Sequence, residues 1–370
     1  MRTIGTVVRG VRAPIIREGD NIAEVAAASV MEAWKEAGIE PRDRDVVAVT
    51  ESVVARAQGN YATLDQIAKD VREKTGGGTV GVAFPILSRN RFSLLLRGMA
   101  MGCKKIVLLL SYPSDEVGNG LVDWDKLDEA GVDPYFYSGI ITDAGAEVEV
   151  IFGNRVQTLC DYTDAVITCD IHTRARSKRL LKAAGARVVL GLDDLLNRSV
   201  DGSGYNAEYG LLGSNKATEE TVKLFPRDCM AVAEELGERL SKASGKHIEA
   251  MVYGDGAFKD PVGKIWELAD PVVSPGYTKG LVGTPNELKL KYLADNDFGD
   301  LKGEALKEAI EERIREKTSE SLVGNMVSEG TTPRRLTDLI GSLCDLTSGS
   351  GDKGTPIVYI QGYFDNYSND

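Results

Sequence analysis

The sequence predicts a chain of mixed strands and helices with a small α/β subdomain inserted in its middle. With 370 residues and 42% hydrophobic content, the chain can bury a full core, in two domains or in one large domain with an insertion. Strand and helix patterns alternate between Cys103 and Asn197, as they do in a small α/β unit. Upstream of that block, the β-branched run from Val46 to Val49 predicts a buried strand in the first part of the chain.

Composition limits the classes of partner. The net charge of -12 argues against binding to a nucleic-acid backbone, which needs excess Lys and Arg. Residues 1–12 lack the apolar core of a signal peptide, and no apolar run is long enough for a bilayer, so we expect a cytoplasmic protein without membrane contact. Five cysteines without a CxxC pair fit reduced thiols. Because the chain has only His172 and His247, hard metals such as Mg²⁺ or Mn²⁺ on oxygen ligands are a better expectation than zinc.

The end of the predicted central strand is the first candidate site. The strand stops at Thr50-Glu51-Ser52, and Val53, Val54 and Ala57 then follow with helical spacing. The start of such a helix offers free N–H groups to phosphate, and Arg56 could add a cation. No P-loop and no G-x-G-x-x-G motif occurs here, so an ordinary capped junction of an α/β core is the alternative.

Apolar periodicity predicts the remaining elements. A helix that Asp20 or Asn21 caps ends at Gly38 and Pro41, and a further helix contains Leu64 to Val71 and closes at Gly76. The other predicted strands are 80–83, 104–110, 148–152, 165–168, 187–191, 248–253 and 355–360, and the other predicted helices are 94–99, 174–184, 218–240 with an interruption at Pro226, 303–317 and 336–343. The helix over 303–317 is highly charged, which predicts a solvated or intersubunit arm.

Several polar clusters are further candidates. Ser88-Arg89-Asn90-Arg91 places two guanidiniums, Arg89 and Arg91, where they could pair with a substrate carboxylate or phosphate; a surface loop with paired arginines is the alternative. Asp255 lies between two glycines at a strand end, and Asp115 and Glu116 follow another strand, so each is a candidate metal ligand or a plain turn residue. The glycine-rich stretch from Gly349 to Gly354 could turn backbone N–H groups toward phosphate.

Four parts of the chain, in order, resemble the F420-0:γ-glutamyl ligase family. They cover both ends of the chain but not Cys103 to Asn197, which looks like an insertion relative to compact members. The matching segments are Pro14-Ile15-Ile16 with Glu18-Gly19-Asp20; Val49-Thr50 through Arg56-Ala57-Gln58-Gly59; Ser214-Asn215, Leu224 to Asp228 and Val252 to Asp255; and Gly349 to Val358.

The resemblance implies an α+β fold with a mixed sheet and an inserted small α/β subdomain, in an intertwined homodimer. On this basis we divide the chain into residues 1–102, 103–200 and 201–370. The implied reaction uses GTP (or ATP) and Mg²⁺ or Mn²⁺ to join L-glutamate or a similar amino acid to a small-molecule carboxylate through an acyl phosphate. The protein would hold the triphosphate, neutralise it and align the two substrates.

The resemblance also implies roles for individual residues. Those expected to contact the nucleotide are Pro14, Ile15, Ile16, Glu51, Ser52, Arg56, Asn215, Gly349, Ser350, Gly351 and Gly354. Asp255 would bind metal. The sequence departs from the family pattern at Leu212, Gly256 and Ser350, where metal ligands are expected, and at Glu51-Ser52, where a lysine normally follows the serine. Oxygens from the insertion, including Asp115 and Glu116, could replace the missing ligands.

Two other functions fit parts of the sequence. Leu212, an apolar residue at an expected ligand position, favours a nucleotide-binding or regulatory protein without catalysis on the same fold. The middle α/β block would suit a dinucleotide-binding oxidoreductase, but no glycine fingerprint follows Leu108 or Val189, which counts against it.

Overall fold

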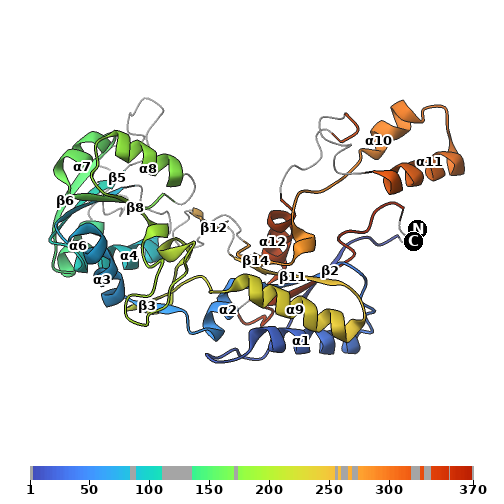
Figure 1. Cartoon of the computed structure of the whole chain (residues 1–370), viewed down its shortest axis with the longest axis horizontal. Helices are drawn as coiled ribbons and strands as arrows, with labels where there is room; N and C mark the ends of the chain where they lie inside the picture. Colours follow the sequence, from blue (N-terminus) through green and yellow to red (C-terminus); the bar gives the residue numbers. More distant parts are fainter. Residues whose placement is uncertain are drawn as a thin grey trace, which may run out of the picture.

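The computed structural model describes residues 3–83, 89–110, 136–170, 174–254, 257–259, 266–268, 274–317, 326–328, 335–349 and 351–368. The structure is α+β, as predicted, and its described elements form two lobes and a projecting helical arm (Figure 1). None of the helices in these ranges is both long and apolar enough to cross a membrane.

The first lobe is built on a five-stranded mixed sheet with the strand order β1-β15-β2-β11-β14. β2 and β11 are parallel, whereas β15 is antiparallel to both β2 and β1, and β14 is antiparallel to β11. The elements of this lobe are β1 (Val7–Val11), α1 (Ile22–Ala37), β2 (Asp45–Thr50), α2 (Glu51–Ala57), α9 (Cys229–Ser244), β11 (Ile248–Tyr253), β14 (Gly276–Tyr277), η3 (Lys279–Leu281), α12 (Leu336–Thr347) and β15 (Ile357–Gln361).

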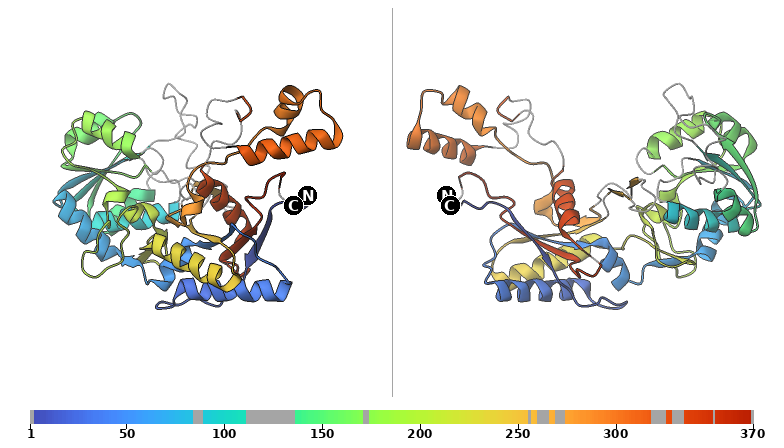
Figure 2. Two further views of the ribbon diagram at one scale, coloured as in Figure 1. Left: turned by 45° about the vertical axis from the view of Figure 1, so that its right-hand side comes forward. Right: turned by 180° about the vertical axis from the view of Figure 1, so that it is seen from behind.

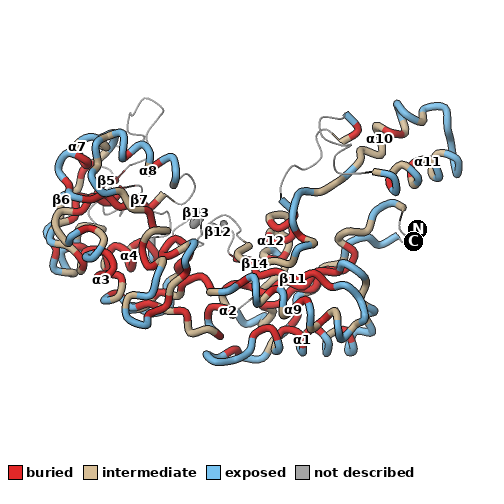
Figure 3. Tube along the Cα trace, in the orientation of Figure 1, coloured by how far each residue is buried: buried red, intermediate tan, exposed pale blue. Residues whose placement is uncertain are grey.

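Helices cover both faces of this sheet, so its central strands are buried from end to end (Figure 3). All six residues of β2 are buried, and their side chains alternate between two cores. Val47 and Val49 pack in the core that α1 and α9 close, while Val46 and Ala48 pack in the core that α12 closes. Burial on both faces explains why the strand is a continuous apolar run in the sequence.

The second lobe contains a five-stranded parallel sheet with the order β6-β5-β4-β7-β8. α3, α4 and α6 pack on one face and α7 and α8 on the other. A small antiparallel sheet, β3-β10-β9, adjoins it. The elements are β3 (Tyr61–Thr63), α3 (Leu64–Thr75), β4 (Thr79–Ala83), α4 (Arg89–Met101), β5 (Lys105–Leu110), α6 (Phe136–Asp143), β6 (Glu147–Phe152), α7 (Val156–Tyr162), β7 (Ala165–Thr168), α8 (Arg174–Ala183), β8 (Val189–Gly191), η1 (Leu192–Asp194), η2 (Gly210–Gly213), β9 (Asn215–Lys216) and β10 (Thr221–Lys223).

This parallel sheet draws on more of the chain than the stretch from 103 to 200. Its middle strand is β4, which pairs with both β5 and β7 and precedes residue 103. β5 and β6 follow β4 on one side of it, and β7 and β8 then follow on its other side. This strand order is that of a doubly wound sheet. The division of the chain at residue 103 remains a prediction, but the α/β sheet itself begins upstream of it.

One predicted helix is wrong. Residues 218–226 were expected to be helical, but Thr221–Lys223 form β10, and α9 begins only at Cys229. Pro226 removes a backbone donor, and Asp228 adopts the left-handed conformation with φ 53°, so a helix does not continue through this point. β1, α6 and α7 were not predicted.

Two short crossings of the chain join the lobes, and buried hydrogen bonds tie them together. On the outgoing crossing, the buried amide of Asn60 donates to the carbonyls of Tyr205 (2.9 Å) and Phe225 (2.6 Å) and accepts from the Tyr205 N–H (3.1 Å). On the returning crossing, Gln58 and Arg227 exchange side-chain and backbone hydrogen bonds, each 2.7 Å long. These contacts set how β10 approaches α2.

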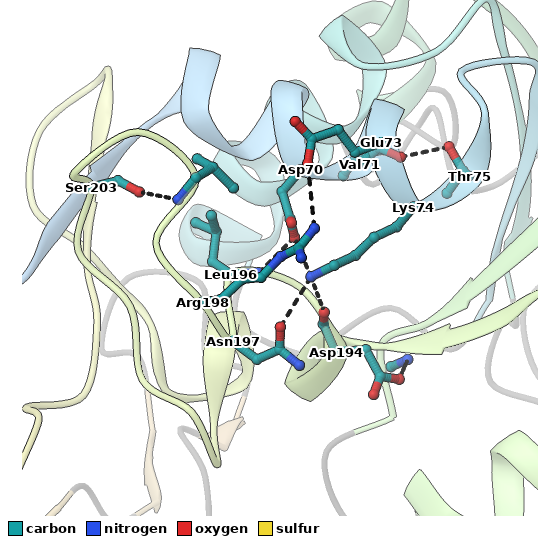
Figure 4. A network of polar contacts seen from close by, with 12 residues as sticks. Asp70, Val71, Glu73, Lys74, Thr75, Asp194, Leu196, Asn197, Arg198 and Ser203 are labelled. Atoms are coloured by element: carbon teal, nitrogen blue, oxygen red, sulfur yellow. Dashed lines mark hydrogen bonds and ion pairs between the residues drawn. The ribbon is translucent and has the colours of Figure 1, made fainter.

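A buried ion pair organises one side of the second lobe (Figure 4). The fully buried carboxylate of Asp70, on α3, accepts from Lys74 Nζ (2.8 Å) and from the Leu196 N–H (2.7 Å). Lys74 Nζ also donates to the carbonyl of Asp194 (2.6 Å) and to Asn197 Oδ1 (3.1 Å). The pair therefore fixes the segment after β8 against α3.

The arm comprises α10 (Leu290–Tyr292), η4 (Leu293–Asp297) and α11 (Gly303–Glu316), and it extends away from the first lobe in all three views (Figures 1 and 2). It has a small core of its own in which Leu293, Ile310 and Ile314 are buried. The helix predicted over 303–317 is thus confirmed. Elsewhere, β12 (Ala257–Lys259) and β13 (Trp266–Leu268) form an antiparallel pair.

Candidate functional site

The junction between β2 and α2 is where most of the described candidate residues gather. β2 ends at Thr50, and α2 starts at Glu51 with Thr50 as its N-cap, whose side chain makes no capping hydrogen bond. α2 has only seven residues, so its dipole is weak and side chains must supply most of the charge that a phosphate group would meet. The structure supplies such a charge from a part of the chain that the sequence did not single out.

That charge is the ammonium of Lys223, at the end of β10. Lys223 Nζ donates a hydrogen bond to Ser52 Oγ and lies 3.8 Å from Oε2 of the fully buried Glu51. The lysine side chain is only 15% exposed, so its charge acts where water screens little. In the register of the small sheet Lys223 faces Asn215, another of the residues expected to contact nucleotide. Glu51, Ser52, Asn215 and Lys223 therefore form one cluster.

The segment over residues 13–16 is held by hydrogen bonds to α2 and to the glycine-rich loop. The Ile16 carbonyl accepts a 2.6 Å hydrogen bond from Arg56 Nε, and the Ala13 N–H donates to the Gly354 carbonyl at 3.1 Å. Arg56 is thus engaged with the backbone, in a positioning role. Pro14 is exposed, and Ile15 is 83% exposed although it is a large apolar side chain. Because it is exposed, the Ile15 side chain contributes nothing to the core of the first lobe.

The glycine-rich loop closes on itself next to this segment. Gly349 and Thr355 exchange backbone hydrogen bonds of 3.2 and 2.7 Å, and the Gly354 N–H donates to Gly351 at 3.0 Å. Gly354 has φ 62°, a conformation that favours glycine. The Thr50 N–H donates to the Pro356 carbonyl at 3.0 Å, which holds the loop at the end of β2. Ser350 lies outside the described residues.

Burial raises the pKa of one phenol and one thiol near the junction, those of Tyr253 and Cys229. Burial raises the pKa of Tyr253, at the end of β11, more than the Ser348 hydroxyl lowers it, and the Glu51 carboxylate adds to the increase. Burial, with the charges of Asp228 and Glu51, raises the pKa of the Cys229 thiol to about 12. All five cysteines are free, as predicted. Cys229 therefore stays protonated at neutral pH and does not supply a thiolate nucleophile.

Of the two arginines predicted to be catalytic, only Arg91 has a described side chain, and its described hydrogen bonds run to the backbone of η2. Arg91 is 4% exposed and donates through Nη2 to the carbonyls of Leu211 (3.5 Å) and Leu212. It therefore holds the η2 turn, which precedes Asn215, and its described contacts are those of a positioning residue. Arg89 is the first residue of α4, and its side chain lies outside the description. Leu212 packs its side chain in the core of the second lobe.

The predicted metal ligands are not described by the structure. Asp255, Asp115 and Glu116 all lie outside the described residues, and β11 ends at Tyr253, shortly before Asp255. Among the residues that are described, no three His, Cys, Asp or Glu side chains are grouped as a metal site requires. Glu51 is the one described carboxylate of the junction cluster.

Other acidic residues of the second lobe are engaged in pairs. Lys178 Nζ lies 2.9 Å from Asp193 Oδ1 and 2.6 Å from Asp194 Oδ2, and Ser177 donates to Asp170. The hydrogen bonds and charges of the two aspartates raise the pKa of Lys178, although burial alone would lower it. The partners of these carboxylates all belong to the second lobe, and none of them is a residue of the junction cluster.

The fold and the junction define an α+β protein in which a mixed sheet meets a second, doubly wound lobe beside a buried ammonium group. The chain belongs to the F420-0:gamma-glutamyl ligase family, whose model matches residues 10–362 and so extends across both lobes. No curated protein matches the sequence. Membership makes the protein a ligase of small-molecule substrates.

Proposed function

We propose that this protein is a nucleotide-dependent amide ligase that joins L-glutamate, or a similar amino acid, to a small carboxylate. It uses GTP or ATP with Mg²⁺ or Mn²⁺ and acts as a homodimer. One observation carries the proposal: the segments 13–16, 50–56 and 354–356 meet at the end of β2, with the buried ammonium of Lys223 beside Ser52. The family match supports the type of bond that is made.

The reaction proceeds in two balanced steps. An oxygen of the acceptor carboxylate attacks the γ-phosphorus, the bond from that phosphorus to the β–γ bridging oxygen breaks, and an acyl phosphate forms. The amine of the amino acid then attacks the acyl carbon, the carbon–oxygen bond to phosphate breaks, and the amine loses a proton to solvent. The protein contributes by positioning and by electrostatic stabilisation, because both steps move negative charge between oxygens.

The described residues would divide this work between them. Lys223 would neutralise a phosphate oxygen, and the Ser52 hydroxyl and the Asn215 amide would orient the phosphate chain. Ile15 would cover the nucleotide base, while the backbone of Gly349 to Gly354 would follow the phosphates. Arg56 and Arg91 act indirectly, through the Ile16 and Leu212 carbonyls that they hold.

A divalent metal would bind oxygen ligands here, and it would supply charge neutralisation and alignment of the phosphate chain. Glu51 provides a buried carboxylate of the right hardness, and Asp255 is the second candidate because it follows the neighbouring strand β11. Leu212, which stands where the resemblance expects a metal ligand, packs in the core of the second lobe, so the metal would take its oxygen ligands from Glu51 and Asp255 instead.

The proposal is tested by the mass of the product. Purified protein is incubated with F420-0, the substrate in the family's name, with L-glutamate labelled with ¹⁵N, and with GTP or ATP and Mn²⁺ or Mg²⁺. We expect a product heavier than F420-0 by one glutamyl residue that keeps the label, because the labelled amine becomes the amide nitrogen. D-Glutamate and L-glutamine serve as controls for the amino acid.

A second run replaces F420-0 with a pool of cellular carboxylates. A labelled amide from that pool alone would keep the ligase and change the acceptor. No labelled amide under any condition, with nucleotide still bound, would favour the alternative that Leu212 suggested, a nucleotide-binding protein without catalysis.

A further inference from the structure

A pocket of about 720 Å³ opens at the end of the first lobe's sheet opposite the β2–α2 junction. Its wall is the loop after α1, residues 38–43, together with Arg9 of β1, Lys246 before β11 and Gln361 at the end of β15. β2 runs from this end to the junction, a distance of about 17 Å for six residues of strand. The pocket is therefore separate from the site proposed for the nucleotide.

The side chain that distinguishes this pocket is Arg9. Its Nη1 atom is buried and has no hydrogen-bond partner among the described residues, and no ion pair is formed by its guanidinium within them. Arg9 stands opposite Tyr359 in the β1–β15 register, so both side chains lie on the same face of the sheet. The Trp34 ring, which packs edge-on against Tyr359 at 5.6 Å between centroids, has a second buried donor without an acceptor, Nε1. Buried donors of this kind are rare, because leaving them unpaired is costly.

Hydrogen bonds to Asp45 join two of the segments that line the pocket. The fully buried carboxylate of Asp45 accepts from the backbone N–H of Arg42 (2.7 Å), from the N–H of Gly362 (3.0 Å) and from the Tyr359 hydroxyl (2.5 Å). The loop after α1 and the end of β15 are therefore held together by the Asp45 carboxylate. Gln361 adds a 2.9 Å hydrogen bond to the Glu40 carbonyl.

Among the described residues, the acidic side chains that line the pocket do not pair with Arg9. Arg42 Nη1 is 3.3 Å from Asp365 Oδ2, and Asp43 Oδ1 accepts from the His247 N–H at 2.8 Å. Glu40 and Lys246 are both exposed at the rim. The acidic side chains of the wall are thus engaged with other partners or exposed, and Arg9 is a lining residue without an acidic partner among the described residues.

We propose that this pocket binds a small anion with two or more negative charges, through phosphoryl or carboxylate oxygens, with Arg9 as its central contact. A guanidinium pairs with such groups through two parallel hydrogen bonds, and Arg42 and Lys246 add charge at the rim. A neutral ligand would leave the guanidinium charge of Arg9 unpaired. The anion bridges β1, β15 and the loop after α1, so its binding stabilises the first lobe.

The test is a thermal-shift titration of the full chain with pyrophosphate and, separately, with citrate, at ionic strength held constant with sodium chloride. Because a ligand that binds only the folded state raises the melting temperature, we expect an increase that grows with the logarithm of anion concentration. We expect the increase to vanish in Arg9→Met and to persist in Arg187→Met, which removes an exposed guanidinium of the second lobe. The increase should also persist in Lys223→Met. This variant distinguishes anion binding in the pocket from anion binding at the junction.

The melting temperature without anion shows whether Arg9 binds a ligand or only stabilises the fold. Arg9→Met keeps the apolar stem and removes a buried donor without an acceptor, so we expect the melting temperature without anion to stay equal or rise. An increase in melting temperature with pyrophosphate alone would identify phosphoryl groups as the ligand. An increase with both anions would show that the pocket accepts carboxylates as well. The proposal is overturned if neither anion acts, if Arg9→Met responds like the wild type, or if the shift disappears in Lys223→Met.

Discussion

Replacing Lys223 with methionine is expected to lower kcat/KM for the ligase reaction by about a hundredfold to a thousandfold. Methionine keeps the length of the side chain and removes only the ammonium, which lies beside Ser52 and 3.8 Å from Glu51. Without this charge, the negative charge of the phosphates meets the buried Glu51 carboxylate with less compensation. The effect is measured as kcat/KM for the nucleotide and as the nucleotide Kd.

The control is Lys216→Met. Lys216 lies in the neighbouring strand β9, but its partner is the exposed carboxylate of Glu219, three residues further on. Its loss should leave kcat/KM within about twofold, because exposed ion pairs contribute little. If Lys223→Met folds normally and retains wild-type activity, then the cluster at the start of α2 is not the nucleotide site.

Lys74→Met is expected to destabilise the second lobe by about 3–5 kcal/mol. Lys74 is 17% exposed and Asp70 fully buried, so removing the ammonium leaves a buried carboxylate without its counter-charge (Figure 4). The same change also leaves the Asp194 carbonyl and the Asn197 amide without their donor. The loss is measured as the shift of the urea unfolding transition.

Lys105→Met provides the comparison for this effect. Lys105 forms a 2.7 Å pair with Glu149, but both side chains are partly exposed, so we expect a loss of no more than about 1 kcal/mol. Equal losses in the two variants would show that burial does not govern the contribution of the Asp70–Lys74 pair.

Local patterns in the sequence predicted most of the elements that carry the site. The β-branched run of β2 and the polar stop at Thr50-Glu51-Ser52 placed the strand-to-helix junction correctly. The helix caps were also readable: Asn21 accepts from the Glu24 N–H at 3.1 Å, and Gly38 ends α1 with φ 61°. Such signals act over a few residues, so a single sequence carries them.

Lys223 was missed because its role depends on distant contacts. It contacts Ser52 across a sequence separation of 171 residues. In addition, residues 218–240 were predicted to be helical, so the short strand that carries Lys223 was not predicted. One local signal was present: Thr221 and Val222 are β-branched and closely followed by Pro226, which favours a strand over a helix. The resemblance suggested that the lysine expected after Ser52 was absent, whereas the structure brings an ammonium to that serine from another strand.

Local sequence patterns also could not predict which sheet β4 joins or which groups Arg91 contacts. Both β2 and β4 are buried apolar strands, and nothing within Thr79–Ala83 indicates that its partners are β5 and β7. Arg91 was expected to meet a substrate anion, but its described hydrogen bonds run to the backbone of η2, more than a hundred residues along the chain. Strand pairing across such distances depends on the topology of the whole fold. The acceptors of Arg91 are backbone carbonyls, which every residue carries, so no residue type marks them in the sequence.

The most direct test of the central claim is phosphate release from GTP and from ATP, with Mg²⁺ or Mn²⁺, in the presence of a carboxylate acceptor and each amino acid in turn. An enzyme that forms an acyl phosphate and transfers it to an amine releases one phosphate for each amide made. We therefore predict release that depends on glutamate and equals the amount of amide product. Tight binding of nucleotide without release under any amino acid would contradict the ligase and leave a nucleotide-binding protein.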